Sequence, residues 1–265
     1  MLKGRNGFWP GRQVVEFIVI VEGTADEQIA RKLAERVILE KIDWVEPYLS
    51  HSVNWRGLLV ETSCSYWRDV KRIFKQVESQ GITIPRYRRG KGLKADGASA
   101  WKILFCVREL QKNRSIRAII LIRDLDNQSE RKTGLEQARE QFAHLSHELQ
   151  IIIGTADPKR EAWVLNGFNS REAPEKASLD EIIQELGFDP CLEPERLRET
   201  SKGVPERTRN IKFVLKTLTG EDAEREAACW QETDLELLRE RGISSGLTAY
   251  LSEVEERLVP IIERE

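Results

Sequence analysis

The chain has 265 residues, of which 40% are hydrophobic, and its formal net charge at pH 7 is −2. This length and composition allow a sizeable core, in one large domain or in one domain with a smaller one appended. Hydrophobic runs fall short of the roughly 20 residues that span a bilayer, and no signal-peptide pattern follows the basic N-terminus, so we expect a cytoplasmic protein without a membrane segment.

The four cysteines lie tens of residues apart, at Cys64, Cys106, Cys191 and Cys229. Cysteine pairs at metal-ligand or redox spacing are absent from the sequence, so it favours neither a zinc knuckle nor a disulfide framework. We expect four reduced thiols.

The small net charge conceals two parts of opposite sign. Residues 166–265 carry 14 Lys and Arg against 23 Asp and Glu, whereas residues 1–165 carry 28 against 21. A basic part fits a polyanionic partner, and an acidic part fits a surface that avoids the polyanion or meets another protein. Two solvated surfaces of different charge are an equally good interpretation.

The first predicted element is a strand over residues 14–21, which are rich in β-branched side chains. Glu22 and Gly23 follow it as a turn, and hydrophobic residues then recur at helical spacing to about Ile42, with Thr24 as the expected N-cap. The pattern is a strand, a tight turn and a helix.

The next elements are less regular. Residues 43–54 read as a short connection or an edge element, and residues 57–61 as a second strand. An amphipathic helix follows over about 67–77, and residues 82–85 form a short strand whose proline suggests a sheet edge.

A basic loop punctuated by glycines follows at residues 86–97, and a helix extends through 101–110. The cations of this loop could lie along a nucleic-acid backbone, and a solvated connector is an equally good interpretation of the loop. The loop lacks the glycine and lysine spacing of a P-loop. The candidate phosphate contacts are Arg86, Arg88, Arg89, Lys91 and Lys94.

A run of large aliphatic residues over 118–122 predicts a strand buried on both faces, as in a parallel sheet. It ends in Asp124 and Asp126, whose side chains would point the same way along an extended segment and could hold one hard cation. An Asp-x-Asp that only begins a turn or caps the following helix is the commoner arrangement.

A charged helix over about 135–149 and a short strand over 151–153 complete the alternation. Strands that alternate with helices predict an α/β fold with a mainly parallel, Rossmann-like sheet flanked by helices. We expect this domain to end near residue 168 and a helical C-terminal extension to occupy 169–265. Its predicted helices are 178–186, 205–218, 221–230 and 247–264.

Three predicted strands end in acids, and the carboxyl ends of parallel strands share one edge of the sheet. The acids are Glu22 with Asp26, Asp124 with Asp126, and Asp157 with Glu161. Clustered carboxylates need cations to neutralise them. Oxygen ligands without nearby Cys or His favour Mg²⁺ or Mn²⁺, as one ion or two.

The sequence Glu22-Gly23 after the first strand, Asp26 four residues on, and Asp124-Leu125-Asp126 after a later strand resemble the Toprim domain. The version that they resemble is that of the overcoming-lysogenization-defect (OLD) nucleases and related small proteins of phage defence. The resemblance covers about residues 14–168.

The resemblance implies metal-dependent cleavage of phosphodiester bonds. Glu22 would be the general base or a metal ligand, Asp124 and Asp126 would hold the principal cation, and Asp26 with Glu161 or Asp157 would complete a second site. A lysine would help the pentavalent phosphate, and Lys159 or Lys91 are the candidates.

The expected function is thus a Mg²⁺-dependent nuclease that acts on DNA, or RNA, in defence against foreign DNA. The OLD relatives carry an ATPase domain, and since this chain has no Walker motif, the ATPase would be a separate partner. The sequence also allows a homodimer. The alternatives are a binding or regulatory module without catalysis and a nucleotide-handling phosphotransferase.

Overall fold

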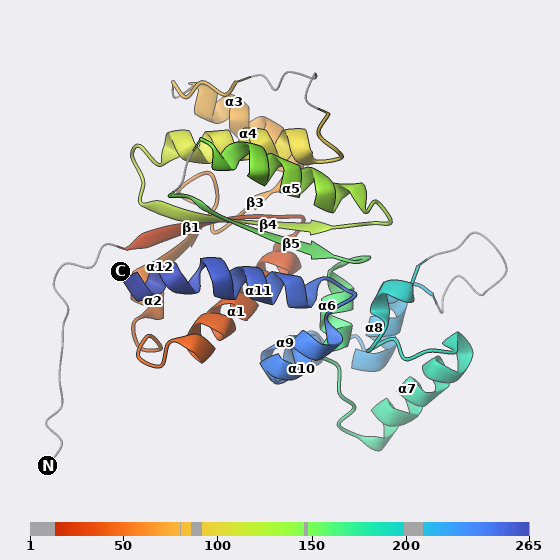
Figure 1. Cartoon of the computed structure of the whole chain (residues 1–265). Helices are drawn as coiled ribbons and strands as arrows, with labels where there is room; N and C mark the ends of the chain where they lie inside the picture. The colour runs from red at the N-terminus through yellow and green to blue at the C-terminus, as the bar shows by residue number, and fades with distance from the viewer. Residues whose placement is uncertain (1–13, 80, 86–91, 146–147, 199–208, 265) are drawn as a thin grey trace, which may run out of the picture.

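The computed structural model describes residues 14–79, 81–85, 92–145, 148–198 and 209–264. Within them the fold is α/β, as expected: a parallel sheet of five strands lies between two layers of helices, with a helical region toward the C-terminus (Figure 1). The strands are β1 (Val15–Val21), β2 (Val53–Arg56), β3 (Ser65–Tyr66), β4 (Ile116–Asp124) and β5 (Gln150–Ala156).

The sheet order is β2-β1-β4-β5, and the short β3 pairs with β1 beyond the end of β2. The consecutive hydrophobic residues of β1 and β4 are buried on both faces of the sheet, as is typical of strands in a parallel sheet. Ile18 pairs with Ile119, and Ile120 with Ile152. All carboxyl ends therefore lie at one edge of the sheet.

One face of the sheet is covered by α3, α4 and α5 (Figure 1). The backbones of α4 and α5 approach closely, since a Cβ at Gly134 would lie 2.0 Å from the carbonyl oxygen of Ala95. This contact holds the segment that leads into α4 against α5. The bounds are α3 (Val70–Ser79), α4 (Gly97–Leu110) and α5 (Glu130–Ala143).

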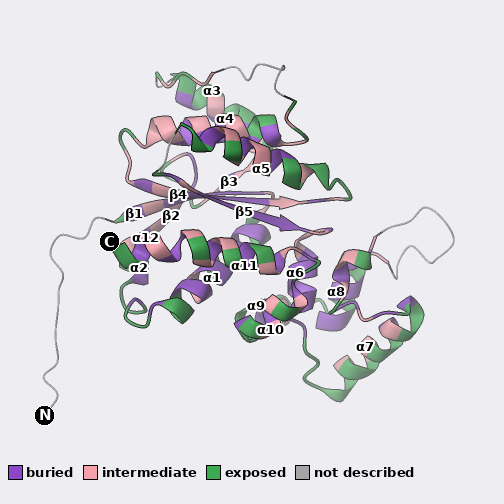
Figure 2. Cartoon of the chain, viewed as in Figure 1, coloured by how far each residue is buried: buried purple, intermediate pink, exposed green. Residues whose placement is uncertain are grey.

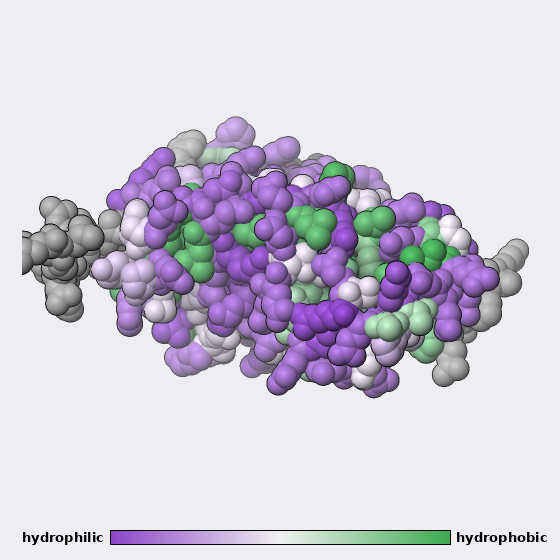
Figure 3. Space-filling view, turned by 90° about the horizontal axis from the view of Figure 1, so that it is seen from below, coloured by the Kyte–Doolittle hydropathy of each residue, from purple (hydrophilic) through white to green (hydrophobic). Residues whose placement is uncertain are grey.

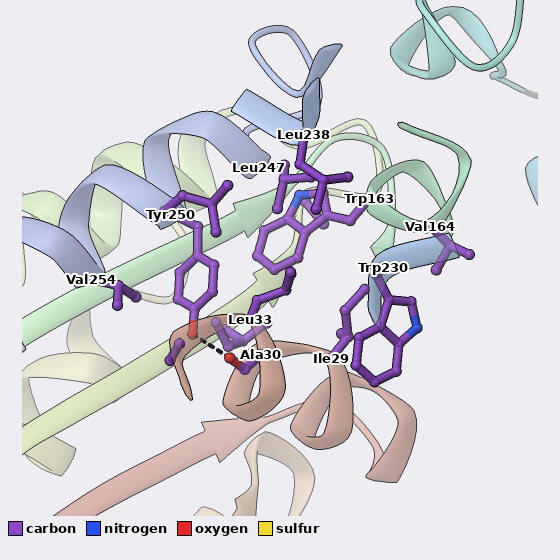
Figure 4. Close-up of a cluster of buried hydrophobic side chains, with 14 of the residues drawn as sticks. Ile29, Ala30, Leu33, Trp163, Val164, Trp230, Leu238, Leu247, Tyr250 and Val254 are labelled. Atoms are coloured by element: carbon purple, nitrogen blue, oxygen red, sulfur yellow. Dashed lines mark hydrogen bonds between the residues drawn. The ribbon is translucent and has the colours of Figure 1, made fainter. Parts of the chain in front are cut away.

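The other face packs against α1 and, from the far end of the chain, α11 and α12. Tyr250 of α11 is fully buried, stacks on Trp163 at a centroid distance of 5.1 Å, and donates a hydrogen bond to the carbonyl of Ala30 (Figure 4). One buried cluster thus includes residues on both sides of position 168. The bounds are α1 (Thr24–Lys41), α11 (Leu247–Arg257) and α12 (Val259–Arg264).

The remaining helices gather near the carboxyl edge of the sheet, where α7 projects outward with most of its surface exposed (Figure 2). They are α6 (Arg160–Asn166), α7 (Ala173–Leu186), α8 (Ile211–Thr219), α9 (Ala223–Gln231) and α10 (Leu235–Arg241). Short helical turns in the described residues include α2 (Leu49–Ser52), Trp67–Asp69 and Pro194–Arg196.

Several expected elements differ from the structure. Residues 57–61 do not form a strand, because the second strand lies earlier, at β2, within the segment expected to be a connection. Residues 82–85 are likewise outside any strand. Gly23, with extended backbone, is the N-cap of α1, and Thr24 is the first helical residue.

The described helices include none that is both long and apolar enough to cross a membrane. Seen from below, the surface is mostly hydrophilic with small separate hydrophobic groups (Figure 3). All four cysteines are free thiols, and burial raises the pKa of Cys106 to about 12.

Candidate functional site

The carboxyl edge brings together acids from three segments. Glu22 follows β1, Asp124 is the last residue of β4, and Glu161 lies in the first turn of α6, which follows β5. Asp26 joins them from the first turn of α1. These four residues are called the carboxylate cluster below.

Asp124 connects the parts of the cluster. Its Oδ1 accepts a hydrogen bond of 2.9 Å from the backbone N–H of Arg160, and its own N–H donates to Oε1 of Glu22 over 3.2 Å. The end of β4 is therefore hydrogen-bonded both to the turn after β1 and to the start of α6.

The electrostatics of Asp124 are unusual for a carboxyl group. Burial, together with the charges of Asp26, Glu22 and Glu161, raises the pKa of Asp124 to about 8, although the N–H of Arg160 opposes this shift. A carboxyl group with this pKa is mostly protonated at neutral pH. The other three carboxylates thus disfavour a negative charge on Asp124, and its protonation relieves that repulsion.

Asp26 and Glu161 are each only 7% exposed. Burial raises the pKa of Asp26, and Glu22 and Glu161 add to the rise, while Arg160 and the backbone of Gly23 oppose it. Its Oδ2 accepts a hydrogen bond of 2.6 Å from the N–H of Gly23, so Asp26 also holds the turn that places Glu22.

The positive charges nearest to the cluster in this structure are those of arginines. Arg123 Nη1 lies 2.9 Å from Glu22, and Arg160 Nε lies 3.7 Å from Asp26. Arg160 Nη2 is 3.5 Å from Glu161. Sequence patterns did not identify these cations, although both sit beside a predicted acid.

Asp126 lies outside the cluster. The strand ends at Asp124, and Asp126 has a φ of 45°, so the expectation that alternation along an extended segment aligns the two acids is wrong. Its carboxylate pairs with Arg131 at 2.8 Å and with Lys159 at 3.4 Å. Lys159 is therefore placed beside Asp126.

Of the two candidate acids after β5, only Glu161 joins the cluster. Asp157 faces Arg198, whose Nη2 donates to Oδ1 over 2.6 Å. Burial raises the pKa of Asp157, Arg198 opposes the rise and Glu195 adds to it. Asp157 is thus an ion-pair partner of the helical region.

The donor chemistry of the cluster suits a hard divalent cation, because its ligand atoms are carboxylate oxygens. As the side chains stand, however, the described part of the chain has no group of three or more acidic, His or Cys residues close enough to hold a metal ion. An ion that entered would have to draw the carboxylates together in place of the arginines.

The predicted nucleic-acid contacts Arg86, Arg88, Arg89 and Lys91 lie outside the described residues. Lys94 is described, and its Nζ pairs with Glu130 at 2.7 Å.

Asp96, which sequence patterns did not single out, accepts a 2.8 Å hydrogen bond from Arg123 Nε and lies 3.5 Å from Arg131 Nε. The segment after the basic loop is therefore tied to the arginines around the cluster. Periodicity and spacing in the sequence do not identify Asp96, since its partners Arg123 and Arg131 lie in β4 and α5.

Comparison of the chain with protein-family models, with curated proteins and with solved structures found no match. The Toprim resemblance stays a prediction from the motifs.

Proposed function

We propose that the protein is a Mg²⁺- or Mn²⁺-dependent nuclease that hydrolyses phosphodiester bonds of DNA at the carboxylate cluster. The supporting observation is the convergence of three carboxyl groups, those of Glu22, Asp26 and Glu161, on Asp124, whose pKa is raised to about 8 by burial and by these three charges. Carboxyl groups whose pKa is shifted this far are typical of functional sites. We also propose that the protein acts in the cytoplasm, in defence against foreign DNA, together with a separate ATPase partner.

Asp26, Asp124 and Glu161 would hold the cation. When bound, a divalent cation would polarise the phosphate and lower the pKa of a coordinated water. The Glu22 side chain is 29% exposed, against 10% for Asp26 and Glu161, so it can reach solvent water as a ligand or general base. Lys159, 38% exposed, can approach the phosphate oxygens.

The test is cleavage of supercoiled plasmid with Mg²⁺ or Mn²⁺ by wild type, Asp124→Asn and Glu22→Gln, with folding checked by circular dichroism. Asn and Gln keep the shape of each side chain but remove its charge. We expect nicking by wild type and a loss of at least about a hundredfold in both variants, as for removal of a catalytic group. Glu181→Gln, an exposed acid on α7, is the matched control and should cleave like wild type.

The second candidate is a binding or regulatory module without catalysis. The observation that favours it is that Glu22, Asp26 and Glu161 already have arginine neighbours, which can satisfy a purely structural role. Wild type that neither cleaves DNA nor gains stability from either cation would support it. A nucleotide-handling phosphotransferase would instead be stabilised by nucleotide and leave plasmid intact.

A further inference from the structure

A pocket of ≈ 320 Å³ lies beside the carboxylate cluster, between the turn after β4, the start of α6 and the start of α8. This volume is at the small end of the range for ligand sites, roughly 300–1,000 Å³. Four cations and one acid, Asp126, are among the residues that line it. The four define what is called the cationic pocket below: Lys159, Arg198, Arg209 and Lys212.

Arg198 is fixed on the pocket wall. It donates hydrogen bonds of 2.6 Å both to Oδ1 of Asn127 and to Oδ1 of Asp157. One guanidinium group is thus held in a set orientation by the ends of β4 and β5, while its side chain is 37% exposed. A preorganised cation of this kind loses little conformational entropy when an anion binds.

Lys159 and Lys212 have weaker partners. Lys159 Nζ is 3.4 Å from Asp126, and Lys212 Nζ is 3.9 Å from Glu161, with the lysine side chains 38% and 62% exposed. Both ammonium groups can therefore turn toward a ligand without breaking a short hydrogen bond. Lys159 also offsets the repulsion between Asp126 and a bound anion.

Arg209 carries a hydrogen-bond donor without an acceptor among the described residues. Its Nε–H is buried, and among the described residues it has no hydrogen-bond partner. A buried donor without an acceptor costs free energy, and the same residue lines the pocket. The guanidinium fork matches the oxygens of a phosphate group in geometry as well as charge.

We propose that the cationic pocket binds a phosphate group, and that this phosphate belongs to the nucleic-acid strand whose neighbouring phosphodiester lies at the carboxylate cluster. The assignment to a strand rests on the proposed nuclease function, whereas the affinity for phosphate does not. Asp126 joins the two sites, since it lines the pocket and directly follows Asp124 and Leu125 in the chain.

The test is binding in EDTA, where metal-dependent cleavage cannot occur. Calorimetric titration of the full chain with pyrophosphate, and separately with a single-stranded ten-nucleotide oligothymidylate, would compare wild type with Arg209→Gln and Lys212→Gln. Lys216→Gln is the matched control, because Lys216 lies on the same helix, is similarly exposed and does not line the pocket. Thermal unfolding of each variant checks folding, and Arg209→Gln breaks no hydrogen bond of Nε.

We expect both pocket variants to bind both ligands about tenfold more weakly, the factor for one charge-assisted hydrogen bond, and the control to bind like wild type. Equal affinity of wild type and the pocket variants, or no binding by wild type, would overturn the proposal. Pocket-dependent binding of pyrophosphate without binding of the oligonucleotide would overturn the assignment to a strand. Intact binding in a protein that never cleaves DNA would reject the nuclease function and leave the phosphate pocket standing.

Discussion

At the residue scale, ionisation of Asp124 costs free energy in the folded protein, which is unfavourable for a carboxyl group with a purely structural role. Its pKa is raised above the ordinary value of 3.8 to about 8, first by burial and then by the neighbouring acids. A raised carboxyl pKa means that the native state binds the proton more tightly than the unfolded chain does. This contribution to stability is therefore present below the unfolded pKa and is lost as pH rises through the native pKa.

We accordingly expect Asp124→Asn to stabilise the metal-free protein at pH 8, by on the order of 2 kcal/mol. The amide keeps the oxygen that accepts from the N–H of Arg160. Urea unfolding in EDTA measures the difference. It should shrink as the pH is lowered below the ordinary value of 3.8, where the carboxyl group is protonated in both states.

A variant that is less stable than wild type at pH 8, with no dependence on pH, would mean that the Asp124 carboxylate is a stabilising structural group. Glu181→Gln, remote from the cluster on an exposed position of α7, should unfold like wild type at both pH values.

The acids of the site could be predicted from the sequence more readily than the cations. Glu22 and Asp124 were found because each directly follows a hydrophobic strand, and the edge of a parallel sheet then brings them together. The choice between Asp157 and Glu161 could not be made, since it depends on the first turn of α6. Arg123 and Arg160 could not be predicted as partners, because a long flexible side chain has many reachable acids.

At the element scale, long periodic segments were predictable and short ones were not. The β4 strand was expected at 118–122 and extends over Ile116–Asp124. The two-residue β3 has no periodicity to detect, and β2 was missed because its four residues follow a helical turn. The close packing of α4 on α5 had no sequence signal beyond two glycines.

Replacement of Gly134 by Ala tests that packing. Alanine should favour the helix by about 1 kcal/mol, but a Cβ at this position would lie 2.0 Å from the backbone oxygen of Ala95, which cannot rotate away. We expect the clash to win and the variant to lose about 2 kcal/mol of unfolding free energy. Lys132→Ala, at an exposed position of the same helix, is the control in the same urea titration. Stabilisation of both variants would contradict the close approach.

The projecting helix α7 depends on ion pairs as well as on Ile182 and Leu186, its two buried residues. Glu175 accepts from Arg225 Nε over 2.6 Å and from the N–H of Arg171 over 2.6 Å. The hydrogen bond from Arg225, supported by that from Arg171, lowers the pKa of Glu175 below its ordinary value of 4.5. The pair therefore stabilises α7 above that pH and is lost as the pH falls through the native pKa.

Hydrogen exchange of the α7 amides checks this pair. At pH 7 we expect Glu175→Gln to exchange faster than wild type, by the factor of about five that corresponds to 1 kcal/mol. Wild type and variant should converge as the pH falls through the native pKa of Glu175. Equal protection of the two proteins at pH 7 would show that hydrophobic contacts alone hold the helix.

At the scale of the whole molecule, the last two helices, α11 and α12, belong to a helical layer of the α/β fold. Tyr250 of α11 packs on Trp163 and bonds to Ala30, so one core crosses the predicted boundary at residue 168 (Figure 4). The boundary itself stays a prediction. Hydrophobic periodicity predicts helices but carries no information about which sheet face they cover.

The distribution of charge along the sequence likewise does not predict which charged residues meet in the fold. The acidic C-terminal part was expected to avoid a polyanion or to face a protein. Yet three of the four cations of the cationic pocket, Arg198, Arg209 and Lys212, come from that part. Folding places them beside the strand ends of the basic part, and a charge count along the sequence cannot show this.

The most direct test of the account is calorimetric titration of the full chain with Mn²⁺, compared with Asp124→Asn and with the control Glu181→Gln. We expect wild type and the control to bind one or two ions, and Asp124→Asn to lose at least one of them, because the carboxylate cluster is the proposed cation site. Wild type that binds no Mn²⁺, or Asp124→Asn that binds it as wild type does, would contradict the central claim.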